Sequence, residues 1–469
     1  MQSSLYCQAE ALLLRPEFGY YSIAHSRRSG EDSLNPVKIG LLGLGTVGGG
    51  TYRVLIRNAE EIARRAGRGI IISHASVRNP DRVPGLGLED VRLSDDPREV
   101  VNDPEVSVVV ELIGGYDDAF ELVMRAIENG KHVVTANKAL IALHGNELFK
   151  AAQDRGVMIA FEGAVAGGIP IIKSIREGLA GNKIEWLAGI VNGTCNFILT
   201  EMREKGREFN DVLAEAQQLG YAEADPSFDI DGIDAAHKLT ILASIAFGIP
   251  LQFDRVYTEG LGTVTRDDVV YAEELGYIIK HLAIARKTDG RVELRVHPTL
   301  IPERRLIASV NGVMNAIMVW ADALGPTLYY GPGAGGEPTA SAVVADLVDV
   351  VRTLTTDPDN RVPHLAFKPD QIADLPISSI DEVETSYYIR LQAVDRPGVM
   401  ATVSGIMGDL DISIEAIIQK EPGEGETTVP LILLTRRVRE KAVSEAIRQF
   451  KHLDVIVGDV TRLRVETLT

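Results

Sequence analysis

Cysteine is scarce in this chain of 469 residues, since Cys7 and Cys195 are the only two. Two thiols cannot build a disulfide-rich scaffold or a cysteine-rich zinc site. Basic residues are outnumbered as well, because 48 lysines and arginines stand against 66 aspartates and glutamates, a formal net charge of −18. A surface with this excess of negative charge repels polyanions, so we expect no nucleic-acid partner.

Long hydrophobic runs are also missing. The longest, at 239–251, is too short to span a bilayer and contains Gly248 and Pro250, so it indicates a buried helix. Residues 1–33 include acidic residues and no sustained apolar stretch, unlike a secretion signal. We therefore expect a cytoplasmic protein without a membrane partner.

The composition itself is typical of globular proteins, with 45% hydrophobic and 24% charged residues. At roughly 100–200 residues per domain, the length predicts two to four domains. We place them at 1–35, an N-terminal extension expected to be poorly ordered, and at 36–162, 163–375 and 385–469.

Short β-branched runs alternate with helical patterns from residue 36 to about 162. The expected strands are 37–42, 70–77, 106–113, 132–135 and 157–161. This order predicts an α/β fold with a Rossmann-like, doubly wound parallel sheet. Beyond it, the expected helices 170–179 and 209–219 mix with candidate strands 184–191, 292–298 and 306–310, which predicts an α+β domain.

The last part of the chain, 385–469, follows a proline- and aspartate-rich linker. Its pattern is strand, helix, strand, strand, helix, strand, at 387–394, 399–408, 413–419, 429–435, 440–449 and 455–464. The order βαββαβ predicts a ferredoxin-like domain.

A glycine-rich loop, Gly43-Leu-Gly45-Thr-Val-Gly48, follows the first expected strand and opens the first expected helix. In a dinucleotide-binding loop such glycines permit the tight turn, the approach of a pyrophosphate, and the packing of helix on strand. The pyrophosphate would lie at the free amides of the helix N-terminus. The alternative is a glycine turn that only joins strand to helix.

The end of the second expected strand discriminates NADP from NAD. An acid there would bind the ribose 2′-hydroxyl, whereas an arginine accommodates a 2′-phosphate. The sequence has Arg78 and no acid until Asp81. We therefore expect NADP, with NAD as the alternative if Arg78 is only a solvated loop residue.

Five acidic residues lie within residues 223–234, and Lys238 follows them at the entrance to the apolar helix. Asp234 and Lys238 are four residues apart and share one helix face. A lysine beside a carboxylate in such a place suits proton transfer. An ordinary ion pair with a helix-capping loop is the alternative.

Other polar residues follow expected strands, where open α/β sheets bind ligands. Lys138 comes directly after strand 132–135, and Gly193 and Thr194 follow strand 184–191. A second glycine loop, 331–336, precedes an expected helix and could close over a nicotinamide. The alternatives are a solvated first-turn lysine and an ordinary glycine turn. The histidines lack the spacing of a metal site.

Together these motifs resemble the homoserine dehydrogenase family, followed by an ACT-type domain. The most specific match, 216–238, reads Ala-x3-Gly-Tyr-Ala-Glu-Ala-Asp-Pro-x2-Asp-Ile-x-Gly-x-Asp-x3-Lys and fits the family signature without a gap. Supporting motifs are at 43–48, 135–138, 162–167, 192–194 and 331–335. The resemblance implies reversible NAD(P)-dependent interconversion of L-aspartate 4-semialdehyde and L-homoserine, in threonine, methionine and isoleucine biosynthesis. The chain lacks the length for a fused aspartate kinase, so the enzyme is expected to be monofunctional.

The resemblance also implies roles for the charged residues. Lys238 would donate a proton to the alkoxide that hydride transfer creates, with Lys138 as a second cation and Asp234 orienting Lys238. The implied cofactor-binding residues are Gly43, Gly45, Thr46, Val47, Gly48, Arg78, Lys138, Gly333 and Gly335.

For the substrate, the resemblance implies two further groups of residues. Glu223, assisted by Asp229, would bind the ammonium group. Gly193 and Thr194 would meet the carboxylate.

A monovalent cation, Na⁺ or K⁺, is implied between the domains. Its ligands would be Glu162 and the backbone carbonyls of Val165, Gly167 and Ile169, since hard cations prefer oxygen. The alternative is that 163–168 is only a flexible glycine hinge.

The C-terminal part resembles the ACT fold through Asp395-Arg-Pro-Gly398 and 411–415. This implies an amino-acid effector, and we expect threonine to be a feedback inhibitor. A domain that only strengthens oligomerisation is the alternative, and a homodimer or homotetramer is expected either way.

Residues 1–35 have no counterpart in the family core.

Two other functions compete with the main reading: another NAD(P)-dependent oxidoreductase acting on a small amino-acid-like carbonyl, and a non-catalytic amino-acid sensor. The glycine loop and both lysines argue against the sensor, and also against a scaffold protein.

Overall fold

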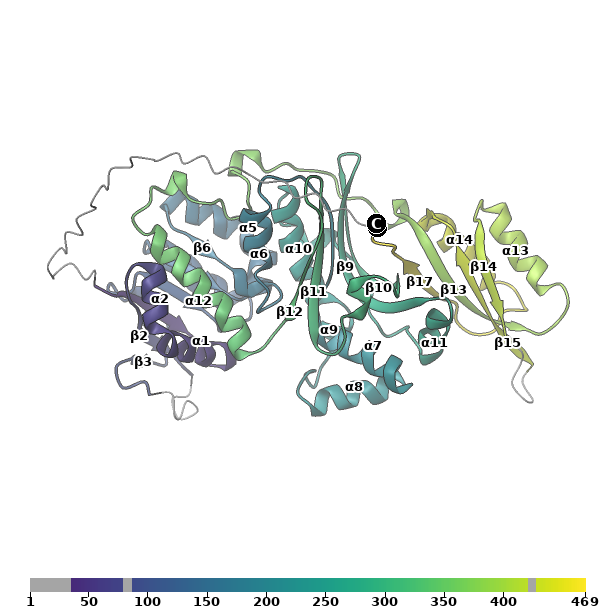
Figure 1. Ribbon diagram of the computed structural model, residues 1–469, viewed down its shortest axis with the longest axis horizontal. Helices are drawn as coiled ribbons and strands as arrows, with labels where there is room; N and C mark the ends of the chain where they lie inside the picture. The colour runs from purple at the N-terminus through teal and green to yellow at the C-terminus, as the bar shows by residue number, and fades with distance from the viewer. Residues whose placement is uncertain (1–34, 79–86, 421–426) are drawn as a thin grey trace, which may run out of the picture. The chain divides into compact units, whose positions relative to one another are not determined.

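The computed structural model describes residues 35–78, 87–420 and 427–469 (Figure 1). The chain divides into two units, Met1–Asn35 and Pro36–Thr469, and the second contains all the helices and strands of the described residues. The predicted extension, 1–35, lies outside the described residues except for Asn35.

The second unit begins with a six-stranded parallel sheet in the order β3-β2-β1-β4-β5-β6, which confirms the predicted Rossmann-like fold. Its strands are β1 (Val37–Leu42), β2 (Ile70–Ser76), β3 (Arg92–Ser94), β4 (Val108–Glu111), β5 (His132–Thr135) and β6 (Ile159–Ala160). The helices are α1 (Thr46–Arg57), α2 (Ala59–Ala66), α3 (Pro97–Asn102), α4 (Asp117–Glu128) and α5 (Lys138–Arg155). Every residue of β4 and β5 is buried, as in parallel strands covered on both faces. The loops after β1, β4 and β5 therefore meet at one edge of the sheet.

A helix from far along the chain completes this domain. Helix α12 (Gly336–Thr353) packs against α1 and lies beside it in Figure 1. Its residues Val343 and Leu347 share a hydrophobic cluster with Leu41 of β1. The glycine loop before α12 is thereby held near the glycine loop before α1.

The middle part of the chain, for which the resemblance implies a catalytic role, is a mainly antiparallel sheet covered by helices. Its strands are β7 (Ile184–Ile190), β9 (Tyr277–Thr288), β10 (Arg291–Pro302), β11 (Met314–Ala321) and β12 (Gly325–Pro332), with the short β8 (Tyr257–Thr258) beside β10. The helices are α7 (Gly193–Lys205), α8 (Phe209–Gln218), α9 (Ser227–Ile230), α10 (Ile233–Phe247) and α11 (Arg266–Glu274). All of α10 from Asp234 to Phe247 is buried, which confirms the predicted buried helix.

One expected strand of this part is wrong. Residues 306–310 form a 3-10 helix at Leu306–Ser309 instead. Ile307 turns into the core, and the buried ammonium of Lys280 donates a hydrogen bond to the Val310 carbonyl at 2.5 Å, which removes that carbonyl from any ladder.

One expected helix is only partly right. Residues 170–179 are α-helical at α6 (Ile171–Lys173) and continue as a π-helix over Ser174–Gly178. The Glu162 carboxylate caps its start by accepting hydrogen bonds from the amides of Ile172 and Lys173, at 2.9 and 2.8 Å.

The C-terminal part has the predicted ferredoxin-like order β17-β13-β15-β14, antiparallel throughout. Its elements are β13 (Glu384–Val394), α13 (Val399–Asp409), β14 (Ile414–Gln419), β15 (Thr428–Thr435), the two-residue β16 (Val438–Arg439), α14 (Glu440–Phe450) and β17 (Thr461–Val465). The last strand begins later than the expected 455–464, because Gly458 has a φ of 75° and breaks the extended run.

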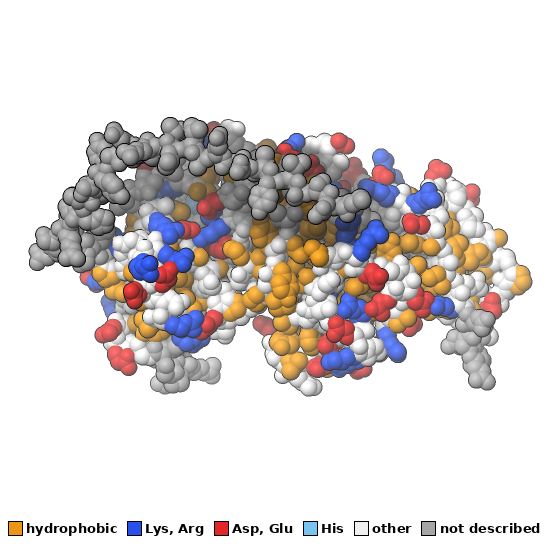
Figure 2. Space-filling view, in the orientation of Figure 1, with side chains coloured by type: hydrophobic (Ala, Val, Ile, Leu, Met, Phe, Trp, Pro, Cys, Tyr) orange, Lys and Arg blue, Asp and Glu red, His pale blue; other side chains and the backbone are white. Residues whose placement is uncertain are grey.

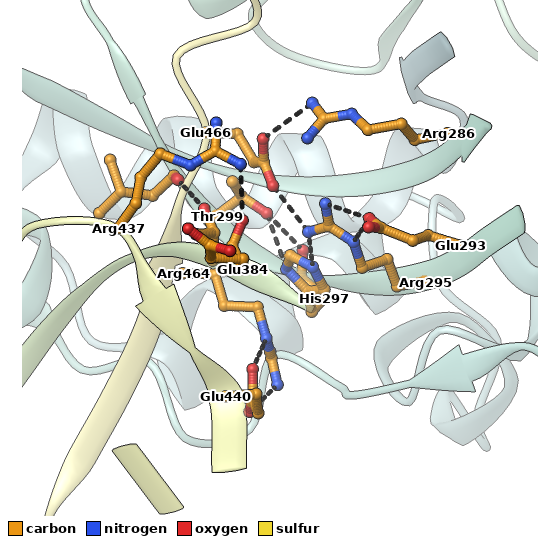
Figure 3. A network of polar contacts seen from close by, with 12 residues as sticks. Arg286, Glu293, Arg295, His297, Thr299, Glu384, Arg437, Glu440, Arg464 and Glu466 are labelled. Carbon is orange, nitrogen blue, oxygen red and sulfur yellow. Dashed lines mark hydrogen bonds and ion pairs between the residues drawn. The ribbon is translucent and has the colours of Figure 1, made fainter. Parts of the chain in front are cut away.

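The catalytic and C-terminal sheets are joined, which the sequence pattern does not predict. Strand β17 pairs in parallel with β10, with Thr299 opposite Arg464 and Leu300 opposite Val465. One sheet of 11 strands therefore runs through both parts. Ion pairs cross the join, and Figure 3 shows Glu466 between Arg286 and Arg295.

Candidate active site

The first glycine loop has the geometry that a bound pyrophosphate needs. Gly43 has a φ of 93°, and a Cβ on Gly48 would lie 2.0 Å from the Gly43 carbonyl oxygen. Gly45 faces open space, with no atom of the described residues within 4 Å of a Cβ placed there. Thr46 and Val47 begin α1, whose first turn has no acidic residue and no side-chain cap. The helix end thus offers amides and a positive dipole to an anion.

The second glycine loop lies against the first. A Cβ on Gly336 would be 3.0 Å from the Thr46 carbonyl oxygen, and one on Gly50 would be 2.5 Å from that of Gly336. Gly335 has a φ of 126°, and a Cβ on Gly333 would overlap the Asn315 side chain at 2.1 Å. Gly333, Gly335 and Gly336 therefore have no room or no allowed backbone conformation for a side chain, and the loop borders the nucleotide end of α1.

Arg78 is exposed two residues after the end of β2. This position, beside the carboxyl end of the sheet, is where a dinucleotide-binding fold contacts the 2′-hydroxyl or 2′-phosphate of the ribose.

A second site feature is a cluster of charged side chains, which we call the lysine–aspartate cluster: Lys138, Lys238, Asp229, Asp234 and Asn192. Asp234 lies at its centre. Lys238 Nζ donates to Asp234 Oδ2 at 2.6 Å, and Lys138 Nζ lies 3.1 Å from Asp234 Oδ1. Asn192 Nδ2 donates to Asp234 Oδ2 at 2.9 Å and to Asp229 Oδ1 at 2.8 Å.

Four helices position these groups, and Asp229 lies on the shortest of them, α9. Lys138 is the first residue of α5, after β5, while Asp234 and Lys238 lie one turn apart on α10. Asn192 caps α7, and its Oδ1 accepts a hydrogen bond from the Cys195 amide at 2.8 Å. The structure thus brings the three predicted catalytic residues together.

Two of the three ammonium protons of Lys238 are bound by other described residues, which leaves one for a ligand. Its side chain is 11% exposed, and it donates to Asp234 and, at 2.6 Å, to the Val191 carbonyl. An ammonium group has three donors. The Lys138 side chain, 32% exposed, is the more open of the two.

The charges of the cluster shift its carboxyl groups in opposite directions. Burial would raise the pKa of Asp234, but the ammonium groups of Lys238 and Lys138 outweigh it and hold that pKa well below the usual range. Burial and the negative charge of Asp234 raise the pKa of Asp229. Burial, with Lys138 nearby, lowers the pKa of His237 to about 4, so that this histidine is neutral.

The other residues that were predicted to bind the substrate do not all lie beside the lysine–aspartate cluster. Gly193 and Thr194 open α7, and the Thr194 hydroxyl donates to the Tyr221 carbonyl at 2.6 Å. The Thr194 hydroxyl is also 3.4 Å from Asp229 Oδ2. Glu223 is exposed on the loop before α9, outside the hydrogen-bonded cluster.

The predicted cation ligands surround a tight turn. Glu162, Val165 and Gly167 are buried, and Ala166 and Gly167 have positive φ values of 54° and 47°. Within the described residues no donor reaches the carbonyls of Val165 and Gly167, although the Ile169 carbonyl accepts from the Ile171 amide at 2.8 Å. Buried carbonyls without a donor, next to a carboxylate, fit a hard cation.

Sequence reasoning missed a buried acid near the edge of the parallel sheet. Glu111, at the end of β4, accepts from the Thr135 hydroxyl at 2.6 Å and from the amides of Ile113 and Gly114. Burial raises its pKa. The only signal in the sequence is one acid that ends an otherwise apolar strand.

A parallel sheet with a pyrophosphate-type glycine loop, beside two lysines held by a buried carboxylate, is the arrangement of an oxidoreductase that uses a nicotinamide nucleotide.

Comparison with known proteins agrees with this class. Residues 43–162 match the NAD-binding domain of homoserine dehydrogenase, 170–348 the homoserine dehydrogenase catalytic family, and 387–452 the ACT domain. The homoserine dehydrogenase of Pseudomonas aeruginosa is 64% identical over 93% of this chain and 100% of its own length. The crystal structure of a homoserine dehydrogenase from Thiobacillus denitrificans, 63% identical, superposes with a TM-score of 0.89 over 93% of this chain and 99% of that one. A hyperthermophilic archaeal homoserine dehydrogenase in complex with NADPH is 29% identical, with a TM-score of 0.59 over 68% of this chain and 98% of its own.

The chain belongs to the homoserine dehydrogenase family, and it carries an NAD(P)-binding domain, a catalytic domain and an ACT domain. An ACT domain is typical of proteins that bind an amino-acid effector. Among the described residues, no helix combines the length and the apolar character that crossing a membrane requires.

Proposed function

We propose that the enzyme interconverts L-aspartate 4-semialdehyde and L-homoserine, with Lys238 as the proton donor and acceptor at the substrate oxygen. A bound nicotinamide nucleotide would supply or receive the hydride. The observation that carries the proposal is the third, unused proton of Lys238, beside the more open ammonium of Lys138. Negative charge that develops on the substrate oxygen would be stabilised by both cations.

Asp234 is proposed to orient the two ammonium groups. Because its carboxylate bonds to Lys238 and lies within ion-pair distance of Lys138, it fixes both nitrogens relative to each other. Its low pKa keeps it ionised across the neutral range. It therefore supports the proton transfer without exchanging a proton itself.

The substrate's own charges are proposed to bind on either side of the cluster. The amides of Gly193 and Thr194, in the first turn of α7, suit the carboxylate. Glu223, whose exposed side chain can reach a ligand, and Asp229 suit the ammonium group.

NADP is proposed as the preferred nucleotide, because Arg78 is an exposed basic side chain near the end of β2 and can pair with a 2′-phosphate. A monovalent cation is proposed at Glu162 and the carbonyls of Val165, Gly167 and Ile169. The two carbonyls without donors support that assignment. Titration with KCl and NaCl in a chelated, salt-free buffer would test it by the rise in thermal stability.

Threonine is proposed as the effector of the ACT domain, acting as a feedback inhibitor. The idea fails if threonine changes neither turnover nor melting temperature.

A homo-oligomer is proposed from the β11–β12 hairpin, where Leu324 and Tyr330 are 55% and 59% exposed. Apolar side chains gather in Figure 2 over the region where β11 and β12 lie, and β12 is the edge of the sheet. An exposed apolar edge strand is a site for pairing with a second copy.

The cytoplasm is proposed as the compartment, since a chain with two cysteines gains little from an oxidising one.

The test of the reaction is NADPH oxidation with aspartate semialdehyde, comparing wild type with Lys238→Ala. The matched control is Lys280→Met, which removes another buried lysine, one that bonds to Asn196 and Val310 and not to the cluster. Turnover lost in Lys238→Ala and retained in Lys280→Met would support the proposal. Equal turnover in Lys238→Ala and wild type would refute it.

A further inference from the structure

The segment 257–261 joins the ACT part of the molecule to the loop that carries the substrate residues. It begins as β8, which pairs in parallel with β10. The Glu259 amide donates to the Val296 carbonyl at 2.8 Å, and the Glu259 carbonyl lies 3.0 Å from Nε2 of His281. The backbone of Glu259 is therefore held by β9 and β10.

On one side, this segment touches the junction between α9 and α10. A Cβ on Gly260 would lie 2.6 Å from the Ile230 carbonyl oxygen and 2.9 Å from the Asp231 Cα. The Leu261 amide donates to the same Ile230 carbonyl at 2.9 Å. A movement of the segment must therefore move the junction, because backbone is in contact with backbone.

This junction places the lysine–aspartate cluster. Asp229 lies on α9 directly before it, and Asp234 and Lys238 lie on α10 directly after it. The turn at Gly232, with a φ of 85°, leaves no room for a side chain, since a Cβ there would be 2.9 Å from Thr258.

On the other side, the Glu259 carboxylate is bound by two arginines of β17. Its Oε2 accepts from Arg464 at 2.9 Å, from Arg462 at 3.2 Å and from the Tyr257 hydroxyl at 2.8 Å. Arg464 is fully buried and forms two bonds with Glu440, the first residue of α14, as Figure 3 shows. A chain of charges thus runs from Glu440 through Arg464 to Glu259.

We propose that Glu259 is a positioning residue that transmits the placement of β17 and α14 to the substrate loop. The inference rests on the proposed function, because it assigns the loop that carries Asp229 to substrate binding. A shift of Arg462 and Arg464 moves the Glu259 carboxylate, and the Gly260 contact passes that movement to Ile230 and Asp231. The nucleotide loop is not part of this chain of contacts, so homoserine binding responds and NADP binding does not.

The carboxylate of Glu259 has the charge that this role needs. Burial would raise its pKa, but the guanidinium groups of Arg464 and Arg462 outweigh burial and hold it below the usual range. Hydrogen bonds between ionised partners are short and directional, which makes them suited to fixing position.

The test compares Glu259→Gln with Glu466→Gln in the full-length protein. Both carboxylates pair with arginines across the join of the two sheets, but the ion pairs of Glu466 are with Arg295 and Arg286, whereas Glu259 is itself part of the segment 257–261. Glu259→Gln should raise the KM for homoserine about 3- to 30-fold, the range for residues that couple separated sites, and leave the KM for NADP unchanged. Glu466→Gln should shift both KM values less than about twofold, even if its melting temperature falls as far as that of Glu259→Gln.

Two further readouts keep the inference decidable. Arg462→Gln, a milder change at a partly exposed side chain, should raise the KM for homoserine in the wild-type background and add little in a Glu259→Gln background. Hydrogen–deuterium exchange of the peptide 227–234 should accelerate in Glu259→Gln and stay unchanged in Glu466→Gln. This exchange readout does not depend on turnover, so a wild type inactive on homoserine would defeat the proposed function alone. Equal exchange and equal KM values in the two variants would overturn the coupling.

Discussion

Asp234→Asn is the substitution that tests the electrostatics of the site most sharply. In the wild type, the Asp234 carboxylate compensates two ammonium groups inside the protein, at 2.6 Å from Lys238 and 3.1 Å from Lys138. Asparagine keeps the shape and one acceptor but removes the carboxylate that contacts both ammonium groups directly, so that Asp229 is the remaining acidic group of the cluster. Removing one partner of a buried pair costs roughly 3–5 kcal/mol, and we expect about 3 kcal/mol because Lys238 retains an acceptor.

The pH dependence of this loss follows from the direction of the shift. The folded pKa of Asp234 is depressed, so its ionisation stabilises the fold above the unfolded pKa of about 3.9. That contribution disappears as the pH falls through the lower, folded value. The difference in free energy of unfolding between wild type and Asp234→Asn should therefore be constant from pH 8 to pH 5 and shrink in more acidic solution.

Asp229→Asn is the matched control, because the pKa of Asp229 is shifted in the opposite direction from that of Asp234. Burial and the charge of Asp234 raise the pKa of Asp229, so its ionised form costs stability at neutral pH. Asparagine should leave the protein as stable as the wild type at pH 7, or more stable. Urea denaturation of both variants at several pH values is the assay. The electrostatic account is wrong if Asp234→Asn loses less than about 1 kcal/mol at pH 7, or if Asp229→Asn is destabilised equally.

Two other predictions concern the glycine loop and the buried His132. Gly45→Ala should keep the wild-type melting temperature but bind NADP about 10- to 100-fold more weakly, because a methyl group there meets no protein atom and only a ligand can clash with it. Gly48→Ala should lower the melting temperature itself, since its Cβ would lie 2.0 Å from the Gly43 oxygen; calorimetry and nucleotide titration separate the two, and equal melting temperatures would contradict the prediction. Burial lowers the pKa of His132 to about 4, so its neutral form stabilises the fold above about pH 6.5 and this stability is lost as the pH falls toward 4. Between pH 6.5 and pH 4 the free energy of unfolding should fall by about 3 kcal/mol less in His132→Gln than in the wild type, as measured by urea denaturation. An equal fall in both proteins would show that His132 does not cause the acid sensitivity.

The features predictable from sequence are those that depend on local pattern. The parallel strands, the glycine loop and the Asp234–Lys238 pair follow from hydrophobic period, turn chemistry and helix spacing. Lys138 was found because ligands bind where parallel strands end. The motif that contains Asn192 is visible in the sequence, but its bonds to Asp229 and Asp234 join residues far apart in the chain, so local pattern does not predict them.

Most of the features that the sequence does not predict depend on pairing between residues far apart in the chain. The junction of β17 with β10 involves only two residue pairs, and nothing in either strand specifies the other. Residues 306–310 have the composition of a strand, but the carbonyl at their end, that of Val310, is bound by the side chains of Lys280 and Asn196. Glu162 was predicted as a cation ligand, and its additional use as a helix cap depends on where α6 begins.

The central claim is that the Lys238 ammonium exchanges the proton with the substrate oxygen. The most direct measurement is the single-turnover rate of NADPH oxidation by Lys238→Ala at saturating aspartate semialdehyde, with nucleotide binding followed by fluorescence in the same samples. The account predicts unchanged NADPH affinity and a rate about 10²- to 10⁴-fold lower, the usual cost of losing a general acid. A rate within a few-fold of the wild type, with nucleotide still bound, would contradict it.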